Sequence, residues 1–268
     1  FISLLVSTLL LPTDEYFSVT KADETTRMAL NVIPVNASAS VMPEVFPHMC
    51  NSLEVYPYFK SEVDYVLIDV YSWWYTVTLP RPAHTAPKWC DAEIGDDYGI
   101  LVNANGIVLY KKGYTGAVEY FEGVNFTYNC HSVRAATGTI IQDTVAFGDS
   151  VTETDVLLHR VTDPTPLFFE IPEKVLPPGS YNITAVLKAS STTPNEVITL
   201  EALNEPKDSV IVAKTIKGSD FTAVDRWQIF IFNFSIEQPT FVEFTAHVTD
   251  SMDVAFYSMN VLQVSGGV

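Results

Sequence analysis

The segment Leu176-Pro-Pro-Gly-Ser-Tyr-Asn-Ile-Thr-Ala-Val-Leu-Lys-Ala189 joins a tight turn to a β-strand. Its prolines and Gly179 supply the backbone angles of the turn, and Tyr181 is placed to brace the corner that follows. The sequence therefore predicts a strand over Ser180–Ala189. Comparable runs recur before and after it, and helical periods are absent after about Ser132.

The short β runs of the second half recur at the spacing of a β-sandwich. We predict this fold for residues 132–268. The expected strands are Thr139–Phe147, Thr154–Arg160, Leu167–Ile171, Ser180–Ala189, Val197–Ala202, Val210–Thr215, Trp227–Phe234, Thr240–Val248 and Val254–Val264.

Residues 16–131 mix helical and strand patterns. Thr20-Lys-Ala-Asp23 resembles a capping box and predicts a short helix that runs to Asn31. Asn105-Gly106 predicts a type I′ turn inside a hairpin over Tyr98–Tyr110. Together with expected strands at Ala37–Val41, Leu53–Phe59 and Val63–Tyr71, this order predicts a small α/β domain with a mostly parallel sheet. The whole chain is thus expected to be an α+β protein of two domains.

Residues 1–15 form a separate apolar N-terminal segment. Phe1–Leu11 carries no charge, and the chain does not begin with Met, so we expect a processed or trimmed product. As a helix this stretch would span about 16 Å, half of a bilayer core, and as a strand about 36 Å. Three interpretations stay open: the end of a membrane helix, a strand donated to a neighbouring subunit, or an ordinary buried strand. The residues of a donated assembly strand would be Phe1, Ile2, Leu4, Leu5, Val6, Leu9, Leu10 and Leu11.

Charge and sequons indicate the compartment. The net charge of −17 argues against nucleic acid as a partner. Four Asn-x-Ser/Thr sequons are present, and together with the apolar leader they favour an extracellular glycoprotein that carries N-linked glycans. The predicted glycosylation sites are Asn36, Asn125, Asn182 and Asn233.

Cysteines and acidic residues offer few metal ligands. The chain has three cysteines, and their spacing fits no zinc motif. One disulfide and a free thiol suit an extracellular protein, and we favour a Cys90–Cys130 bond because both residues lie in loop-like stretches that flank one hairpin. The loop containing Asp91, Glu93, Asp96 and Asp97 is a possible Ca²⁺ site, although a solvated acidic loop is the preferred interpretation. We predict no other metal or cofactor.

Part of the first half resembles a known family. The matching stretches are Ile33-Pro-Val-Asn-Ala-Ser-Ala-Ser-Val41, Phe46-Pro-His-Met-Cys-Asn51, Val55-Tyr-Pro-Tyr-Phe59, Asp64-Tyr-Val-Leu-Ile-Asp69 and Asn105-Gly-Ile-Val-Leu-Tyr-Lys-Lys-Gly-Tyr114. They resemble the soluble C-terminal region of the "domain of unknown function 2079" membrane proteins, which are largely archaeal and similar to GT-C glycosyltransferases. The resemblance covers about residues 28–116. It implies that residues 1–11 end a membrane helix and that any catalytic residues lie in membrane segments outside this chain.

The second half is similar to jelly-roll carbohydrate-binding or galactose-binding-like modules. The supporting runs are Leu176–Tyr181, Ile216-Lys-Gly-Ser-Asp-Phe221, Trp227-Gln-Ile-Phe230 and Val242-Glu-Phe244. Such modules often carry an acidic residue just before the last strand segment. Phe256-Tyr-Ser-Met-Asn260 lacks one, which argues against a calcium or sugar site of that type.

No catalytic motif is present: the sequence contains no GxSxG, P-loop or GxGxxG pattern. We therefore expect a non-enzymatic extracellular structural protein, a cell-surface or filament subunit that is released from a membrane precursor. It would assemble with other copies of itself through Phe1–Leu11, in a sandwich groove lined by Phe230, Phe232, Phe234, Phe241 and Phe244. The alternative is a carbohydrate-binding exodomain of a GT-C-like membrane protein. The aromatic patch of Trp73, Trp74, Tyr75 and Trp89 is expected in the core or an interface.

Overall fold

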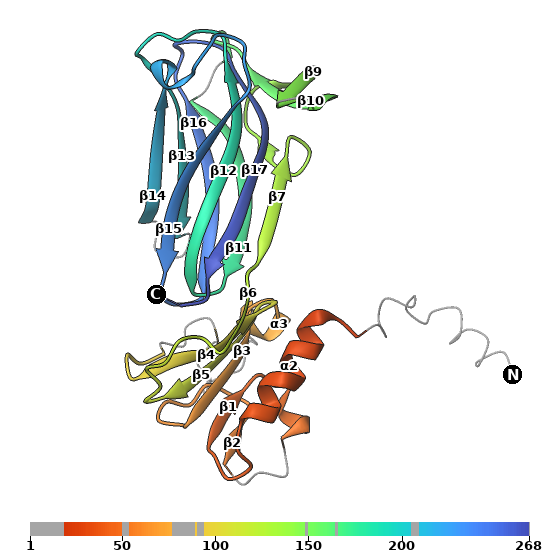
Figure 1. Ribbon diagram of the computed structural model, residues 1–268, viewed down its shortest axis with the longest axis vertical. Helices are drawn as coiled ribbons and strands as arrows, with labels where there is room; N and C mark the ends of the chain where they lie inside the picture. Colours follow the sequence, from red (N-terminus) through yellow and green to blue (C-terminus); the bar gives the residue numbers. More distant parts are fainter. Residues whose placement is uncertain are drawn as a thin grey trace, which may run out of the picture.

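The computed structural model describes residues 19–49, 54–76, 89, 94–147, 150–163, 166–204 and 209–267. The predictions for Phe1–Leu11, Cys50, Cys90, Asp91 and Glu93 lie outside these residues. The described part consists of an N-terminal lobe, residues 19–123, and a sandwich, residues 124–267, stacked along the long axis of the molecule (Figure 1). Strands predominate in both parts. The helices among the described residues do not have the length and hydropathy of a membrane span.

The N-terminal lobe contains one six-stranded sheet in the order β2-β1-β3-β5-β4-β6. The strands are β1 (Ala39–Val41), β2 (Val55–Tyr56), β3 (Tyr65–Asp69), β4 (Tyr98–Ala104), β5 (Ile107–Lys112) and β6 (Tyr120–Glu122). β1 pairs in parallel with β2 and β3, and β4 does so with β6, whereas β5 is antiparallel to β3 and β4. The sheet is therefore mixed, and the expected α/β domain with a mostly parallel sheet is not confirmed.

Helix α2 (Lys21–Val32) covers one face of this sheet (Figure 1). It begins at the predicted capping box, in which the Thr20 side chain accepts from the Asp23 backbone N–H and the Asp23 side chain accepts from the Thr20 N–H. The short helices η2 (Phe46–His48) and α3 (Trp73–Thr76) complete the lobe. The β4–β5 turn has φ values of 51° at Asn105 and 85° at Gly106, as its Asn-Gly sequence predicts.

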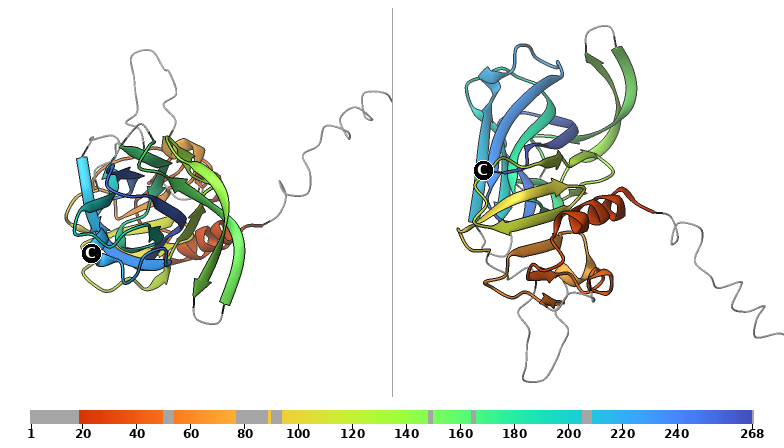
Figure 2. Two further views of the ribbon diagram at one scale, coloured as in Figure 1. Left: turned by 90° about the horizontal axis from the view of Figure 1, so that it is seen from above. Right: turned by 60° about the horizontal axis from the view of Figure 1, so that its bottom comes forward.

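The sandwich contains two sheets that face each other (Figure 2). The first, here the β12 sheet, has the order β15-β12-β17-β10-β9, and β7 pairs with the lower part of β17. The second has the order β14-β13-β16-β11-β8. Their strands are β7 (Asn125–Asn129), β8 (Arg134–Ala135), β9 (Thr139–Phe147), β10 (Ser150–His159), β11 (Leu167–Leu176), β12 (Gly179–Ala189), β13 (Glu196–Asn204), β14 (Ser209–Lys217), β15 (Gln228–Ile236), β16 (Thr240–Val248) and β17 (Val254–Ser265); a short helix, η5 (Gly218–Asp220), follows β14.

All nine strands predicted for the second half are present. Residues of both sheets fill a core with large rings such as Phe168, Phe169 and Phe256, which are fully buried; Phe168 and Phe169 are consecutive, and the β11–β16 register shifts at this place. β7 was not predicted and belongs to the sandwich, so the chain enters this sheet at Asn125, before the expected boundary between residues 131 and 132.

The corner between β11 and β12 joins the two parts of the molecule. The Tyr181 hydroxyl donates to the Pro177 carbonyl at 2.5 Å, which confirms its predicted bracing role. Asn103 of the N-terminal lobe is buried and donates its side-chain amide to the carbonyls of Pro178 and Gly266, both at 2.7 Å. Because these carbonyls belong to the sandwich, the corner ties one part to the other.

Candidate functional site

The outer face of the β12 sheet is built by alternation along its strands. In β12, Tyr181, Ile183 and Ala185 point into the core, whereas Ser180, Asn182 and Thr184 point outward and are partly exposed. β15 and β7 repeat this pattern, with Asn233 and Asn125 on the outside. Three of the four sequons therefore place their asparagine on the same face.

The strand register aligns these three asparagines. Asn233 lies opposite Asn182, Asn182 lies opposite Leu262 of β17, and Leu262 lies opposite Asn125. The row Asn233–Asn182–Leu262–Asn125 thus crosses four neighbouring strands, which corresponds to about 14 Å at the usual strand spacing. Asn125 and Asn233 are exposed, and Asn182 is half-buried.

This row, here the asparagine row, lies on an uncharged surface. Its neighbouring row is Ile231–Thr184–Asn260–Thr127, which holds the hydroxyl residues of two of the sequons. Ser235, Ser180 and Ser265 continue the polar pattern below. The outward side chains of the described strands β7, β12, β15 and lower β17 include a single charged group, Lys188, at the upper end.

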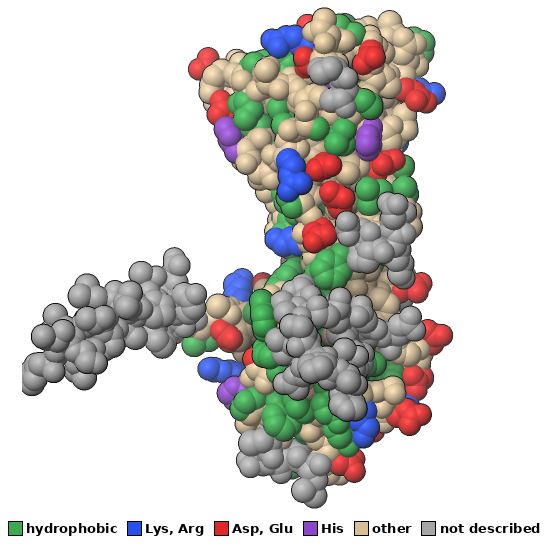
Figure 3. All heavy atoms as spheres, turned by 180° about the vertical axis from the view of Figure 1, so that it is seen from behind, with side chains coloured by type: hydrophobic (Ala, Val, Ile, Leu, Met, Phe, Trp, Pro, Cys, Tyr) green, Lys and Arg blue, Asp and Glu red, His purple; other side chains and the backbone are tan. Residues whose placement is uncertain are grey.

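The opposite sheet differs in charge. Its outer face carries the pairs Arg134–Glu170, at 3.5 Å, and His247–Glu201, at 3.6 Å. The view from behind shows acidic, basic and histidine side chains scattered over the sandwich (Figure 3). Of the two outer faces of the sandwich, therefore, the one that carries the asparagine row is the one that is nearly free of charge along β7, β12, β15 and lower β17.

The β9–β10 hairpin covers the upper end of the asparagine-row face. Val145 and Val156 of this hairpin form a small apolar cluster with Val186, Trp227 and Ala255. The Trp227 indole donates to the Thr144 carbonyl at 3.0 Å, and Lys188 forms an ion pair with Asp143. These contacts leave the lower part of the face, with its sequons, outside the cluster.

A cleft of about 370 Å³ adjoins the lower end of the row, where the N-terminal lobe meets β7. One wall of the cleft belongs to the N-terminal lobe and consists of Thr20, Lys21, Ala22, Tyr71 and Asn105. The other wall is the segment that leads into β7 and consists of Gly123, Val124, Asn125 and Phe126. The rings of Tyr71 and Phe126 meet edge to face, with centroids 6.4 Å apart. Asn125 therefore belongs both to the row and to this cleft.

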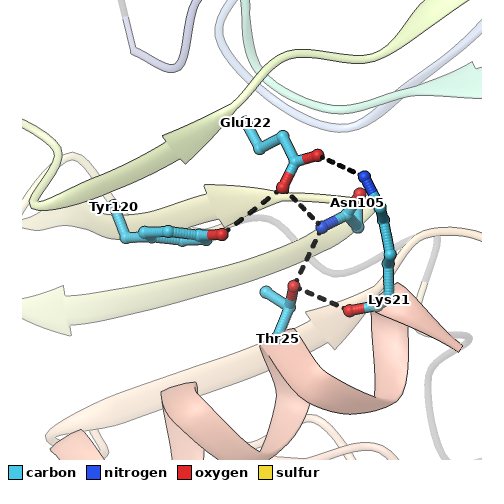
Figure 4. A network of polar contacts seen from close by, with 5 residues as sticks. All are labelled: Lys21, Thr25, Asn105, Tyr120 and Glu122. Carbon is cyan, nitrogen blue, oxygen red and sulfur yellow. Dashed lines mark hydrogen bonds and ion pairs between the residues drawn. The ribbon is translucent and has the colours of Figure 1, made fainter. Parts of the chain in front are cut away.

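A polar network holds one wall of the cleft in place (Figure 4). Glu122 accepts from Lys21 at 3.1 Å, from Asn105 at 3.2 Å and from the Tyr120 hydroxyl at 3.3 Å. Asn105 also donates to Thr25, which in turn donates to the Lys21 carbonyl. The hydrogen bonds from Lys21 and Asn105 hold the pKa of Glu122 below its ordinary value, because they stabilise the carboxylate.

The other predicted site residues do not converge on this place. Asn36 is exposed in the N-terminal lobe, where the hydroxyl of its sequon partner Ser38 donates to Asp64 at 2.8 Å. Asp97 pairs with Lys112 at 3.5 Å in an exposed position. Among the described residues, no group of three or more His, Cys, Asp or Glu side chains is arranged to hold a metal ion.

Cys130 is buried and forms no disulfide with a described residue, whereas Cys90 lies outside the described residues, so the Cys90–Cys130 disulfide stays a prediction. In the aromatic patch, Tyr75 and Trp89 are buried and Trp73 is exposed. Tyr75 stacks on Phe241 of the sandwich, with ring centroids 6.3 Å apart.

The prediction of an open groove lined by phenylalanines is wrong. Phe230, Phe234 and Phe244 are buried in the closed core, where Phe234 stacks on Tyr181. Phe232 packs against the same core, and Phe241 packs against the N-terminal lobe. β15 and β16 lie in different sheets, so Phe230, Phe232, Phe234 and Phe244 fill the space between the sheets, and the five phenylalanines line no common groove.

Comparisons with known proteins give similarity in fold only. No protein-family model matches the chain, and no curated protein matches it in sequence. Similar solved structures include the C-terminal CBM6 of a marine laminarinase, LamC, from Zobellia galactanivorans, which has 8% identity and a TM-score of 0.35 over 52% of this chain and 100% of the other.

Two others are CBM6cm-2 from Cellvibrio mixtus lichenase 5A in complex with cellotriose and CsCBM6-3 from Clostridium stercorarium in complex with cellobiose. The first has 12% identity and a TM-score of 0.30 over 52% of this chain and 97% of the module. The second has 9% identity and a TM-score of 0.34 over 50% and 90%. Similarity at this level is not evidence of a shared ligand or activity. The resemblance of residues 28–116 to the domain of unknown function 2079 stays a prediction.

Proposed function

We propose that this chain is a non-enzymatic, N-glycosylated exterior domain of a cell-surface protein, and that the outer face of the β12 sheet presents its glycans. The single observation that carries the proposal is the asparagine row, in which the register of four strands aligns three sequons on one face. An exposed, uncharged surface leaves room for bulky, neutral carbohydrate. The charge of −17 adds solubility at a cell exterior and disfavours nucleic acid as a partner.

Intact-mass analysis tests this proposal in a host that modifies Asn-x-Ser/Thr sequons during secretion. The expected mass exceeds that of the bare polypeptide by the mass of several glycans. The variants Asn125→Gln, Asn182→Gln and Asn233→Gln should each lose one glycan, whereas Asn129→Gln, outside any sequon, should lose none. A bare polypeptide mass from the secreted wild-type protein would contradict the proposal.

Assembly with other copies of the same chain is the second part of the proposal. β15 pairs with β12 on one side and has no strand partner on its other side among the described strands. An unpaired edge accepts an added strand, and the apolar sequence Phe1–Leu11 supplies one of suitable length. A cell-surface or filament subunit would then be linked through its N-terminal segment.

Deletion of residues 1–11 tests the assembly. The shortened chain should stay folded and run as a monomer in light scattering, and Leu4→Asp/Val6→Asp should do the same, because a charged side chain that becomes buried when the strand is added to the β15 edge is costly. Replacement of the polar Ser7 by Asp is the matched control at the same segment. If the double variant forms the same assemblies as the wild type with the same heat resistance, the N-terminal segment does not link the copies.

The alternative is that the chain is a carbohydrate-binding exodomain of a GT-C-like membrane protein. It is favoured by the cleft beside Asn125, which combines the rings of Tyr71 and Phe126 with amide and hydroxyl groups. Titration with neutral oligosaccharides, followed by NMR of the Asn105 and Asn125 side-chain amides, would detect such binding.

A further inference from the structure

We infer that the cleft between the N-terminal lobe and β7 is a carbohydrate site, and that its occupant is the first part of the glycan attached to Asn125. This inference rests on the proposed glycosylation and assigns one of the glycans a binding site on the protein itself. The glycan would contact helix α2 and the β4–β5 turn on one side and β7 on the other. It would therefore bridge the two parts of the molecule.

The cleft has the size and chemistry of a small carbohydrate site. Its volume of about 370 Å³ falls within the range of small-molecule pockets. Tyr71 is 43% exposed and offers an aromatic ring to the apolar face of a sugar. Thr20, Lys21 and Asn105 supply hydroxyl, ammonium and amide groups for its hydroxyls.

The polar wall is arranged before any ligand binds. Glu122 holds Lys21 and Asn105, and the second amide proton of Asn105 goes to Thr25, so the Lys21 ammonium and the side-chain carbonyl of Asn105 are positioned by the protein's own contacts. The Lys21 ammonium is neutralised by the same carboxylate. The wall therefore presents fixed hydrogen-bonding groups without a net charge, as suits a neutral sugar.

Asn260 orients the acceptor asparagine. Its side-chain amide donates to Asn125 Oδ1 at 2.6 Å and to Thr127 Oγ1 at 3.0 Å, so one side chain of β17 engages both functional groups of the sequon. Asn125 Nδ2, the atom to which a glycan is attached, makes no hydrogen bond to the described residues. Asn125 itself lines the cleft, so the first sugar on Nδ2 is held beside the cleft walls.

Covalent attachment favours this occupant over a free sugar. A tethered ligand experiences an effective concentration in the millimolar range or above, which fills even a weak site. The glycans on Asn182 and Asn233 would be attached outside the lining of this cleft. They serve as internal references on the same sheet.

The experiment measures glycan release from the folded, secreted protein by a peptide-N-glycosidase, site by site, with mass spectrometry of peptides. We expect release from Asn125 to be at least tenfold slower than release from Asn233. Tyr71→Ala should bring the Asn125 rate to within about twofold of the Asn233 rate, and Lys21→Ala, at an exposed position, should accelerate release without unfolding. Thermal unfolding of each variant identifies any general loss of structure, and Tyr58→Ala is the matched control, at an exposed tyrosine outside the cleft lining.

The outcomes separate the inference from the proposed function. Equal release rates from Asn125 and Asn233 in the wild type overturn the cleft assignment and leave the asparagine row intact. An unmodified Asn125 beside modified Asn182 and Asn233, with free N-acetylglucosamine bound in the cleft, also overturns it. If no sequon is modified, both the proposed function and this inference fail.

Discussion

Tyr181 illustrates how one side chain fixes a corner of the fold. Its hydroxyl is buried and donates to the Pro177 carbonyl, and its ring stacks on Phe234 with centroids 5.1 Å apart. Burial raises the pKa of this hydroxyl, so it remains a proton donor. Gly179, two residues before Tyr181, has a φ of 145° and lies so close to Ser265 that a Cβ would meet the Ser265 carbonyl oxygen at 2.1 Å.

We predict that Tyr181→Phe keeps the fold and lowers the free energy of unfolding by about 1–2 kcal/mol, because the Pro177 carbonyl loses its buried donor. Urea unfolding followed by fluorescence measures the change. Tyr58→Phe, at an exposed position, is the control and should change stability by less than about 0.5 kcal/mol. Equal stability of Tyr181→Phe and wild type would show that the hydroxyl does not brace the corner.

A second prediction at the residue scale concerns pH. The folded pKa of Glu122 lies below its ordinary value of 4.5, so the unfolded chain binds a proton more readily than the folded one. The contribution of the Glu122 carboxylate to the free energy of unfolding is complete above pH 4.5 and disappears as the pH falls through the folded pKa. Glu122→Gln should therefore melt at a lower temperature than wild type at pH 7, and the difference should vanish in acid. A difference that persists unchanged at pH 3 would contradict this ionic role.

At the scale of elements, much of the fold is visible in the sequence. The nine later strands, the capping box at Thr20 and the turn at Asn105-Gly106 follow from local patterns. β7 is not among the predicted strands, although Asn125-Phe-Thr-Tyr-Asn129 alternates as a strand should. The mixed sheet and the phenylalanine core depend on which strands pair with one another. Local sequence patterns do not specify this pairing.

The candidate site was only partly predictable for the same reason. The sequons are visible in the sequence, but their alignment joins Asn125 to β17 and Asn182 to Asn233. Such register depends on the packing of distant segments. The cleft likewise combines helix α2, a turn and β7, and each supplies ordinary surface residues.

The connection between the two parts supplies a prediction at this scale. Asn103→Ala should lower the free energy of unfolding by about 1–3 kcal/mol, because the Gly266 carbonyl loses its donor and Pro178 retains only Gln263. Denaturant unfolding measures the change, and Asn31→Ala, at an exposed position, is the control. A neutral effect of Asn103→Ala would mean that apolar contacts such as Tyr75–Phe241 suffice to hold the connection.

For the whole molecule, the apolar residues beside the asparagine row connect glycosylation with solubility. Ile229 and Ile231 are 49% and 63% exposed, and Leu262 is 37% exposed. Large exposed apolar groups on one sheet face promote association when nothing covers them. Glycans on neighbouring asparagines would shield this face.

We therefore predict that protein made without glycans, or the Asn125→Gln/Asn182→Gln/Asn233→Gln variant, associates more strongly than the glycosylated chain. Light scattering against concentration measures the difference. Ile231→Asn in the glycan-free protein should reverse it, whereas Val210→Asn, at an exposed position on another sheet, should not. Equal scattering with and without glycans would exclude a shielding role.

The pairing of β7 with β17 also has a consequence for biogenesis. Asn125 meets its partner Asn260 only after 135 further residues have been added to the chain. At about 5–20 residues per second, translation of this stretch takes on the order of ten seconds. Until then β17, the described strand that pairs with β7, has not been made. An enzyme that acts on extended, unfolded acceptor sequences therefore has an interval in which to reach Asn125 before β7 is incorporated into the sheet.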